Sequence, residues 1–168
     1  MKTFDQARSH HRPGGTAWLY HAGFSLIELM IVVAIVAILA AIAIPAYQKQ
    51  IMQSRESSAK SALLDLARRE ETYYSANNVY TTQLDSLGYL SSNIVGNAIE
   101  VPNNTNEAYY TVTVTPASSG TTASSYTATA TPVTGSTQVN DPCGTYQIDY
   151  LGNQTNTGTS SSGGLSCW

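Results

Sequence analysis

The sequence is short of charged residues and of cysteine. Asp, Glu, Lys and Arg make up 11% of the 168 residues, against roughly 25% in an average soluble protein. The net charge is -3, and neither Lys nor Arg occurs between Ala76 and Trp168, so nucleic acid is not an expected partner. Two cysteines, Cys143 and Cys167, are too few for a zinc site of four thiolates, and one disulfide between them is the natural expectation.

The sequence also lacks the residues that catalytic sites need. All three histidines precede Phe24, and Cys143 and Cys167 are the only cysteines, which removes the usual pairs of nucleophile and base. Asp141 and Asp149 are too few and too far apart in sequence for a calcium loop. We therefore expect no catalytic residue, no metal and no cofactor, and a structural protein rather than an enzyme.

One long apolar run dominates the first third of the chain. Among the 21 residues from Phe24 to Ile44, only Ser25 and Glu28 are strongly polar. As a helix rising about 1.5 Å per residue, the run would reach roughly 30 Å, the thickness of a bilayer core. The sequence therefore predicts a membrane-spanning helix, with the basic residues that precede it left on the cytoplasmic side.

After Pro45 the pattern becomes amphipathic and predicts that the helix continues to about Ser75. Apolar or small residues recur with helical spacing at Ala59, Ala62, Leu63, Leu66, Ala67, Tyr73 and Tyr74. Proline lacks an N–H group and its ring clashes with the preceding turn, so we expect a kink near Pro45.

In the second half of the chain the period changes to two, which is typical of strands. We expect a loop over 76–108 and then four strands, at Tyr109–Thr115, Tyr126–Thr131, Tyr146–Tyr150 and Gln154–Thr157. The Ser/Gly-rich run Thr159–Gly164 should form a mobile loop. The expected fold class is α+β, with a long N-terminal helix packed on a four-stranded antiparallel sheet.

Glu28 leaves two interpretations open. A carboxylate inside an apolar run is either paired or functional, or it sits at the membrane interface where the dipole of a helix N-terminus tolerates it. The residues around Glu28 favour a paired or functional carboxylate. Residues 23–33, Gly-Phe-Ser-Leu-Ile-Glu-Leu-Met-Ile-Val-Val, resemble the processing motif of type IV pilins and related pseudopilins.

This resemblance implies a set of roles for individual residues. Prepilin peptidase would cleave between Gly23 and Phe24, and the new amino group of Phe24 would be methylated. Glu28 would neutralise that ammonium in the same or an adjacent subunit and so set the register of assembly. Pro45 matches the family's helix-kinking proline, and Cys143 and Cys167 match the pair that bounds its C-terminal disulfide loop.

The resemblance also implies domains, partners and location. The expected divisions are a cleaved leader 1–23, an apolar assembly helix 24–53 and a head 54–168, the head comprising helix 54–75, loop 76–108 and the sheet and disulfide region 109–168. Expected partners are other pilins through the N-terminal helix, prepilin peptidase, the inner membrane and the pilus assembly platform. The precursor would cross the inner membrane once with its head in the periplasm, and the assembled subunit would be extracellular.

Within the family, the residues after Ala59 and the ending at Cys167 and Trp168 resemble PilE-type minor pilins of type IVa systems. The expected function is a minor pilin that primes or enters the filament and supports pilus biogenesis, adhesion and twitching motility. A major pilin or a type II secretion pseudopilin is the alternative within the family. A tip adhesin or DNA-uptake module is the alternative of another class, and the lack of Lys and Arg from Ala76 onward argues against DNA capture by this part of the chain.

Overall fold

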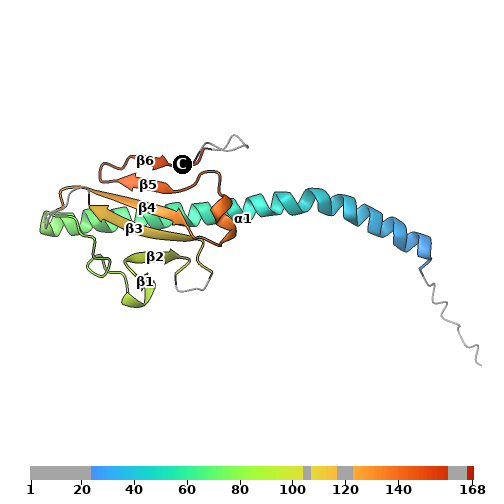
Figure 1. The fold of residues 1–168 in the computed structure, drawn as a ribbon, viewed down its shortest axis with the longest axis horizontal. Helices are drawn as coiled ribbons and strands as arrows, with labels where there is room; N and C mark the ends of the chain where they lie inside the picture. The colour runs from blue at the N-terminus through green and yellow to red at the C-terminus, as the bar shows by residue number, and fades with distance from the viewer. Residues whose placement is uncertain (1–23, 104–106, 117–122, 159–165) are drawn as a thin grey trace, which may run out of the picture. The chain divides into compact units, whose positions relative to one another are not determined.

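The computed structural model describes residues 24–103, 107–116, 123–158 and 166–168 (Figure 1). The predicted leader 1–23, with Gly23, and the predicted mobile loop Thr159–Gly164 therefore lie outside the described residues. The chain forms two compact units, Met1–Ile42 and Ala43–Trp168. One helix, α1 (Leu26–Asn77), contributes residues to both.

α1 begins and ends where the sequence supplies the appropriate residues. Ser25 precedes its first turn, and the hydroxyl Oγ of Ser25 accepts a hydrogen bond from the N–H of Glu28 (3.2 Å), which is the arrangement of an N-cap. The helix continues through Pro45, and the kink expected there stays a prediction. It ends at Asn77, two residues beyond the predicted Ser75, because Asn78 takes a left-handed conformation with φ of 55°.

The sheet has six antiparallel strands, two more than the sequence predicts. They are β1 (Ile94–Val95), β2 (Ala98–Val101), β3 (Tyr110–Pro116), β4 (Tyr126–Pro132), β5 (Tyr146–Asp149) and β6 (Gln154–Asn156), and they neighbour one another in chain order. Two short 3-10 helices, η1 (Ser91–Asn93) and η2 (Thr137–Asn140), complete the described elements. The four predicted strands correspond to β3 to β6.

The expectation of a plain loop over 76–108 is wrong because it contains β1 and β2. These strands have two and four residues, too short for an alternating pattern to stand out. Gly96 and Asn97 lie between them with φ of 63° and 125°, the left-handed conformations that a tight hairpin turn needs. β2 then pairs with β3, where Ile99 lies opposite Val112.

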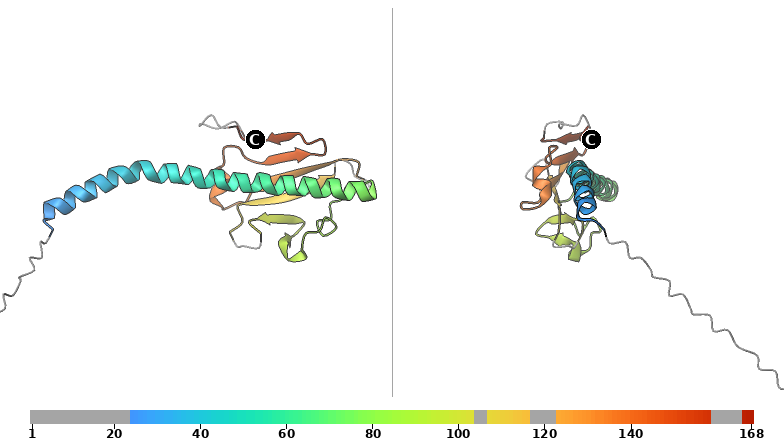
Figure 2. Two further views of the ribbon diagram at one scale, coloured as in Figure 1. Left: turned by 180° about the vertical axis from the view of Figure 1, so that it is seen from behind. Right: turned by 90° about the vertical axis from the view of Figure 1, so that its right-hand side faces the viewer.

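The core of the second unit lies between the C-terminal half of α1 and one face of the sheet (Figure 2). α1 contributes the fully buried side chains of Ala59, Leu63 and Leu66. In β3 and β4 buried and partly exposed residues alternate, so each strand turns one face toward the helix. The small residues Ala128 and Ala130 of β4 leave room for the helix to approach the sheet. The expected cover of the sheet by the amphipathic stretch is confirmed.

Candidate functional site

The predicted processing and assembly residues lie at the start of α1, on an exposed apolar surface. Phe24 is 81% exposed, and Glu28, in the first turn of α1, is also exposed. The ion pairs found in the described part of the chain do not include Glu28, so its carboxylate is free to pair with a cation of another molecule.

The apolar surface of α1 continues far beyond these two residues. Its large apolar side chains are more than half exposed at every position from Leu26 to Ile44, and an 18-residue window reaches a mean hydropathy of 3.0. By length and composition this helix can cross a membrane. An apolar surface of this size is stable only when lipid or another apolar surface covers it.

In the second unit the structure joins Cys143 and Cys167 in a disulfide, with their Cα atoms 5.6 Å apart. Both cysteines are buried, which confirms the expected bridge. The neighbouring indole of Trp168 donates a hydrogen bond to the carbonyl oxygen of Thr155 in β6 (2.7 Å) and meets the ring of Tyr146 edge to face, with centroids 5.6 Å apart. The last residues of the chain are thus fixed to the edge of the sheet.

The backbone near this disulfide is packed so closely that one position requires glycine. A Cβ atom on Gly158 would lie 2.1 Å from the carbonyl oxygen of Pro142, which is far inside van der Waals contact. The N–H of Gly158 instead donates to the carbonyl oxygen of Cys143 (2.9 Å). The segment after β6 is therefore held against the segment before β5 by a backbone hydrogen bond and by the disulfide together.

A buried polar cluster lies beside the disulfide, and the sequence analysis missed it. The carboxylate of Asp141, only 6% exposed, accepts hydrogen bonds from the Tyr110 hydroxyl and from the N–H of Cys143 (2.8 Å). The side-chain amide of Gln138 donates to the same Tyr110 hydroxyl (3.0 Å). Burial, and then the nearby charge of Asp141, raise the pKa of Glu56 on α1. Glu56, Asp141 and Cys143 approach one another closely, but the sulfur of Cys143 is bonded to Cys167 and is not a thiolate ligand.

Glu70 is the second buried acid that the sequence analysis missed. It lies on α1 and is 0% exposed, and one carboxylate oxygen accepts a hydrogen bond from the N–H of Thr81 (3.2 Å). The other oxygen, Oε1, has no hydrogen-bond partner. Burial raises the pKa of Glu70 to about 7. Nothing in the charged run Arg68, Arg69, Glu70, Glu71 distinguishes Glu70 from its neighbours, and its contact with Thr81 joins residues 11 positions apart.

Two family models match the chain, and together they span residues 18–147. The first is the prokaryotic N-terminal methylation motif, over residues 18–44. The second, over residues 45–147, is described as type IV minor pilin ComP, DNA uptake sequence receptor. The chain belongs to the type IV pilin family. The resemblance inferred from the sequence is therefore confirmed, and so is the pilin fold class.

Known type IV pilins share part of this sequence. The chain is 45% identical over 67 residues to the type IV major pilin protein PilA of Myxococcus xanthus, which is 40% of this chain and 30% of PilA. It is 41% identical over 93 residues to the type IV major fimbrial protein FimA of Dichelobacter nodosus, 51% of this chain and 52% of FimA. It is 40% identical over 73 residues to the type IV major pilin protein PilE of Neisseria gonorrhoeae, 44% of each chain. The pilin thus matches between about a third and a half of the length of these relatives.

A solved structure of a type IV pilin from Shewanella oneidensis is also similar, at 23% identity and a TM-score of 0.44, covering 70% of this chain and 97% of that one. Type IV pilins are structural subunits. With its apolar N-terminal helix and prepilin motif, this pilin is made as a membrane-anchored precursor and becomes part of an extracellular pilus.

Proposed function

We propose that this pilin is a minor subunit of a type IV pilus, which primes or enters the filament and supports pilus biogenesis, adhesion and twitching motility. The observation that supports a minor role is the match of residues 45–147 to a model described as a minor pilin. The relatives named major pilins match shorter stretches, of 67, 93 and 73 residues. A major pilin remains the alternative that the experiment below must exclude.

The assembly mechanism that we propose starts at the N-terminus of α1. Cleavage between Gly23 and Phe24 by prepilin peptidase leaves an ammonium group on Phe24, which is then methylated. Glu28 of the same or an adjacent subunit neutralises this group, because an unpaired charge is costly inside a bundle of apolar helices. The exposed apolar side chains of α1 pack against the helices of other pilins, and the assembly platform supplies the site of insertion.

The abundance of the protein in purified filaments tests the minor role. Filaments sheared from cells would be separated and quantified against their most abundant subunit, with an antibody raised against residues 123–158. We expect this pilin at a small fraction of the main subunit, and fewer filaments in a strain that lacks it. If it is itself the main subunit, the minor role is wrong and the chain is a major pilin.

A DNA-uptake receptor is the second candidate function, because the matching model is described as a receptor for DNA uptake sequences. The distribution of charge opposes it. The five Lys and Arg residues that follow Phe24 all lie on α1, between Lys49 and Arg69, and two of them pair with Asp65 at 2.8 Å and 2.7 Å. DNA affinity depends mainly on cations that neutralise phosphates.

A gel-shift titration with a duplex that carries an uptake sequence, and with a scrambled duplex, distinguishes the two candidates. We expect weak binding that does not discriminate between the duplexes and disappears as salt is raised. Sequence-selective binding at physiological salt would instead favour the receptor. In that case Lys49→Gln and Lys60→Gln should each reduce the salt dependence of the affinity.

A further inference from the structure

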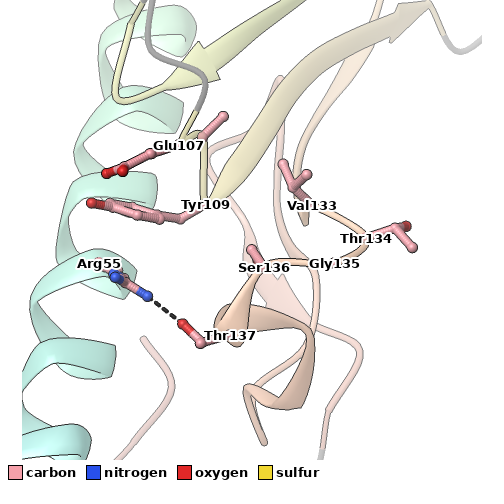
Figure 3. Close-up of a pocket in the computed structure, with 9 residues that line it drawn as sticks. Arg55, Glu107, Tyr109, Val133, Thr134, Gly135, Ser136 and Thr137 are labelled. Carbon is pink, nitrogen blue, oxygen red and sulfur yellow. Dashed lines mark hydrogen bonds between the residues drawn. The ribbon is translucent and has the colours of Figure 1, made fainter.

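A cleft in the second unit combines one guanidinium group with several hydroxyl groups (Figure 3). It has a volume of about 530 Å³, within the usual size range of small-ligand sites. Arg55 of α1 and Tyr109 form one wall, and the turn 133–137 forms the other. Neither the family match nor the proposed assembly mechanism gives this cleft a role.

Backbone hydrogen bonds fix both walls of the cleft. Tyr109 donates its N–H to the carbonyl oxygen of Val101 (2.7 Å) and accepts from the N–H of Val133 (2.9 Å). The turn is closed by the N–H of Ser136, which donates to the carbonyl oxygen of Val133 (3.1 Å). Gly135 supplies the left-handed conformation of this turn, with φ of 91°. The site is thus formed before any ligand arrives.

Arg55 is held in place but keeps donors available. Its guanidinium carbon lies 3.8 Å from the centroid of the Tyr109 ring, and one N–H donates to the hydroxyl of Thr137. In the described part of the chain the ion pairs within 4.0 Å join Asp65 to Arg68 and Arg69, and none involves Arg55. In Figure 3 the Tyr109 ring lies between the Glu107 carboxylate and the Arg55 guanidinium. An arginine oriented in this way, without a carboxylate partner, suits an incoming anion.

We propose that this cleft binds an acidic sugar of the uronate type, whose carboxylate pairs with Arg55. The planar fork of a guanidinium matches a carboxylate with two parallel hydrogen bonds. The hydroxyls of Ser136 and Thr137 on the facing turn accept hydrogen bonds from the N–H of Gln138 and from Arg55, and each can still donate its own proton to an oxygen of the sugar. Arg55 is the one cation among the lining residues, and Glu107 also lines the cleft. The second charge of a phosphate would therefore lose water without a cation to pair with, so the site favours a singly charged carboxylate.

This ligand site goes beyond the structural role of the pilin and can fail independently of it. The full chain in detergent micelles would be titrated with glucuronate, glucose and glucose 6-phosphate, and followed by the amide NMR signals of residues 133–137. We expect saturable changes with glucuronate, much weaker binding of glucose 6-phosphate, and no saturable change with glucose. Incorporation of each variant into filaments, measured in parallel, reports separately on assembly.

Substitutions of single charged residues test whether Arg55 binds the ligand. Arg55→Gln should raise the Kd for glucuronate roughly ten- to a hundredfold, the usual effect of losing a charged hydrogen-bond partner. Arg68→Gln removes the same charge from an exposed position of the same helix and should leave the Kd unchanged. Glu107→Gln should improve the binding of glucose 6-phosphate more than that of glucuronate, because the Glu107 carboxylate repels a dianion more strongly than a monoanion.

Three results would overturn the proposal. They are the absence of a saturable response to millimolar glucuronate, equal binding of glucose and glucuronate, and an unchanged Kd in an Arg55→Gln protein that folds. Since the Arg55 side chain also contacts Tyr109 and Thr137, folding is checked by the NMR signals of β3 and β4. If Arg55→Gln does not fold, Thr137→Val, which removes one orienting hydroxyl, should weaken binding while keeping the charge, and unchanged binding in that variant would refute the site.

Discussion

The buried carboxyl group of Glu70 should make the stability of the head depend on pH. Its pKa rises from an ordinary value of 4.5 to about 7, because burial, and to a smaller extent the charge of Glu71, outweigh the hydrogen bond from the N–H of Thr81. One pKa unit corresponds to about 1.4 kcal/mol, so ionised Glu70 should cost the folded state about 3 kcal/mol. The folded state holds the proton more tightly than the unfolded chain does. The contribution of Glu70 to the free energy of unfolding is therefore fully present below pH 4.5 and is lost as the pH rises to about 7.

Replacing Glu70 with glutamine isolates this effect. Glutamine has nearly the same shape and keeps an oxygen that can accept from the N–H of Thr81, but it does not ionise. Urea unfolding of the fragment Ala43–Trp168, which contains the whole buried core, would be measured between pH 4.5 and pH 8 with the disulfide intact. Over this pH range, the free energy of unfolding of the wild-type head should fall by about 3 kcal/mol more than that of the Glu70→Gln head.

The free energy of unfolding is compared as a function of pH in the wild type and in Glu70→Gln. The difference between the two curves removes the contributions of the other acids. Burial also raises the pKa of Glu56, while hydrogen bonds from Arg68, Arg69 and Tyr89 outweigh burial and lower that of Asp65, but both proteins share these groups. Glu100→Gln removes the same charge from a partly exposed position on β2 and serves as the charge-matched control. Parallel curves for the wild type and Glu70→Gln would show that Glu70 is ionised at little cost, and the reasoning from burial would then be wrong.

The remaining predictions concern the N-terminal motif and the disulfide. Mass spectrometry of assembled material should find N-methylated Phe24 as the first residue, and a peptide that begins at Met1 or beyond Ile44 would disprove the assignment. Glu28→Val should leave the head folded but impair entry into filaments, since an unpaired ammonium in an apolar bundle costs several kcal/mol. Equal incorporation of a correctly processed mutant would contradict the pairing. Cys143→Ser should lower the free energy of unfolding of the head by about 2 to 4 kcal/mol while α1, β3 and β4 persist, and urea unfolding with circular dichroism would detect a smaller loss or a complete collapse.

Elements with long periodic patterns could be predicted from the sequence. The runs YYTVTVT and YTATAT alternate over enough residues to mark β3 and β4 within one residue of their observed ends. β1 and β2 were missed because two and four residues give no measurable period. Their formation depends on pairing with β3, a contact between segments that no local pattern encodes.

Sites that depend on tertiary packing were harder to foresee. The motif around Glu28 is local, so it could be recognised in a single stretch of sequence. Glu70, Asp141 and Arg55 acquire their surroundings from Thr81, Tyr110 and Thr137 respectively, which lie 11, 31 and 82 residues away. A charged residue on an amphipathic helix is ordinarily solvated. These residues differ because segments distant in the sequence pack against them.

The Cys143–Cys167 bond also limits how far the head can lengthen when it is pulled. The two cysteines are separated by 24 positions in sequence, and a covalent loop of this size cannot open under tension. Stretched chain spans at most about 3.4 Å per residue, so the bond withholds roughly 80 Å of contour length from a mechanically unfolded subunit. A force applied between the start of α1 and Trp168 would bypass this loop through the sulfur atoms. In a filament that is pulled along its axis, a reduced subunit would yield a longer extension step than an oxidised one.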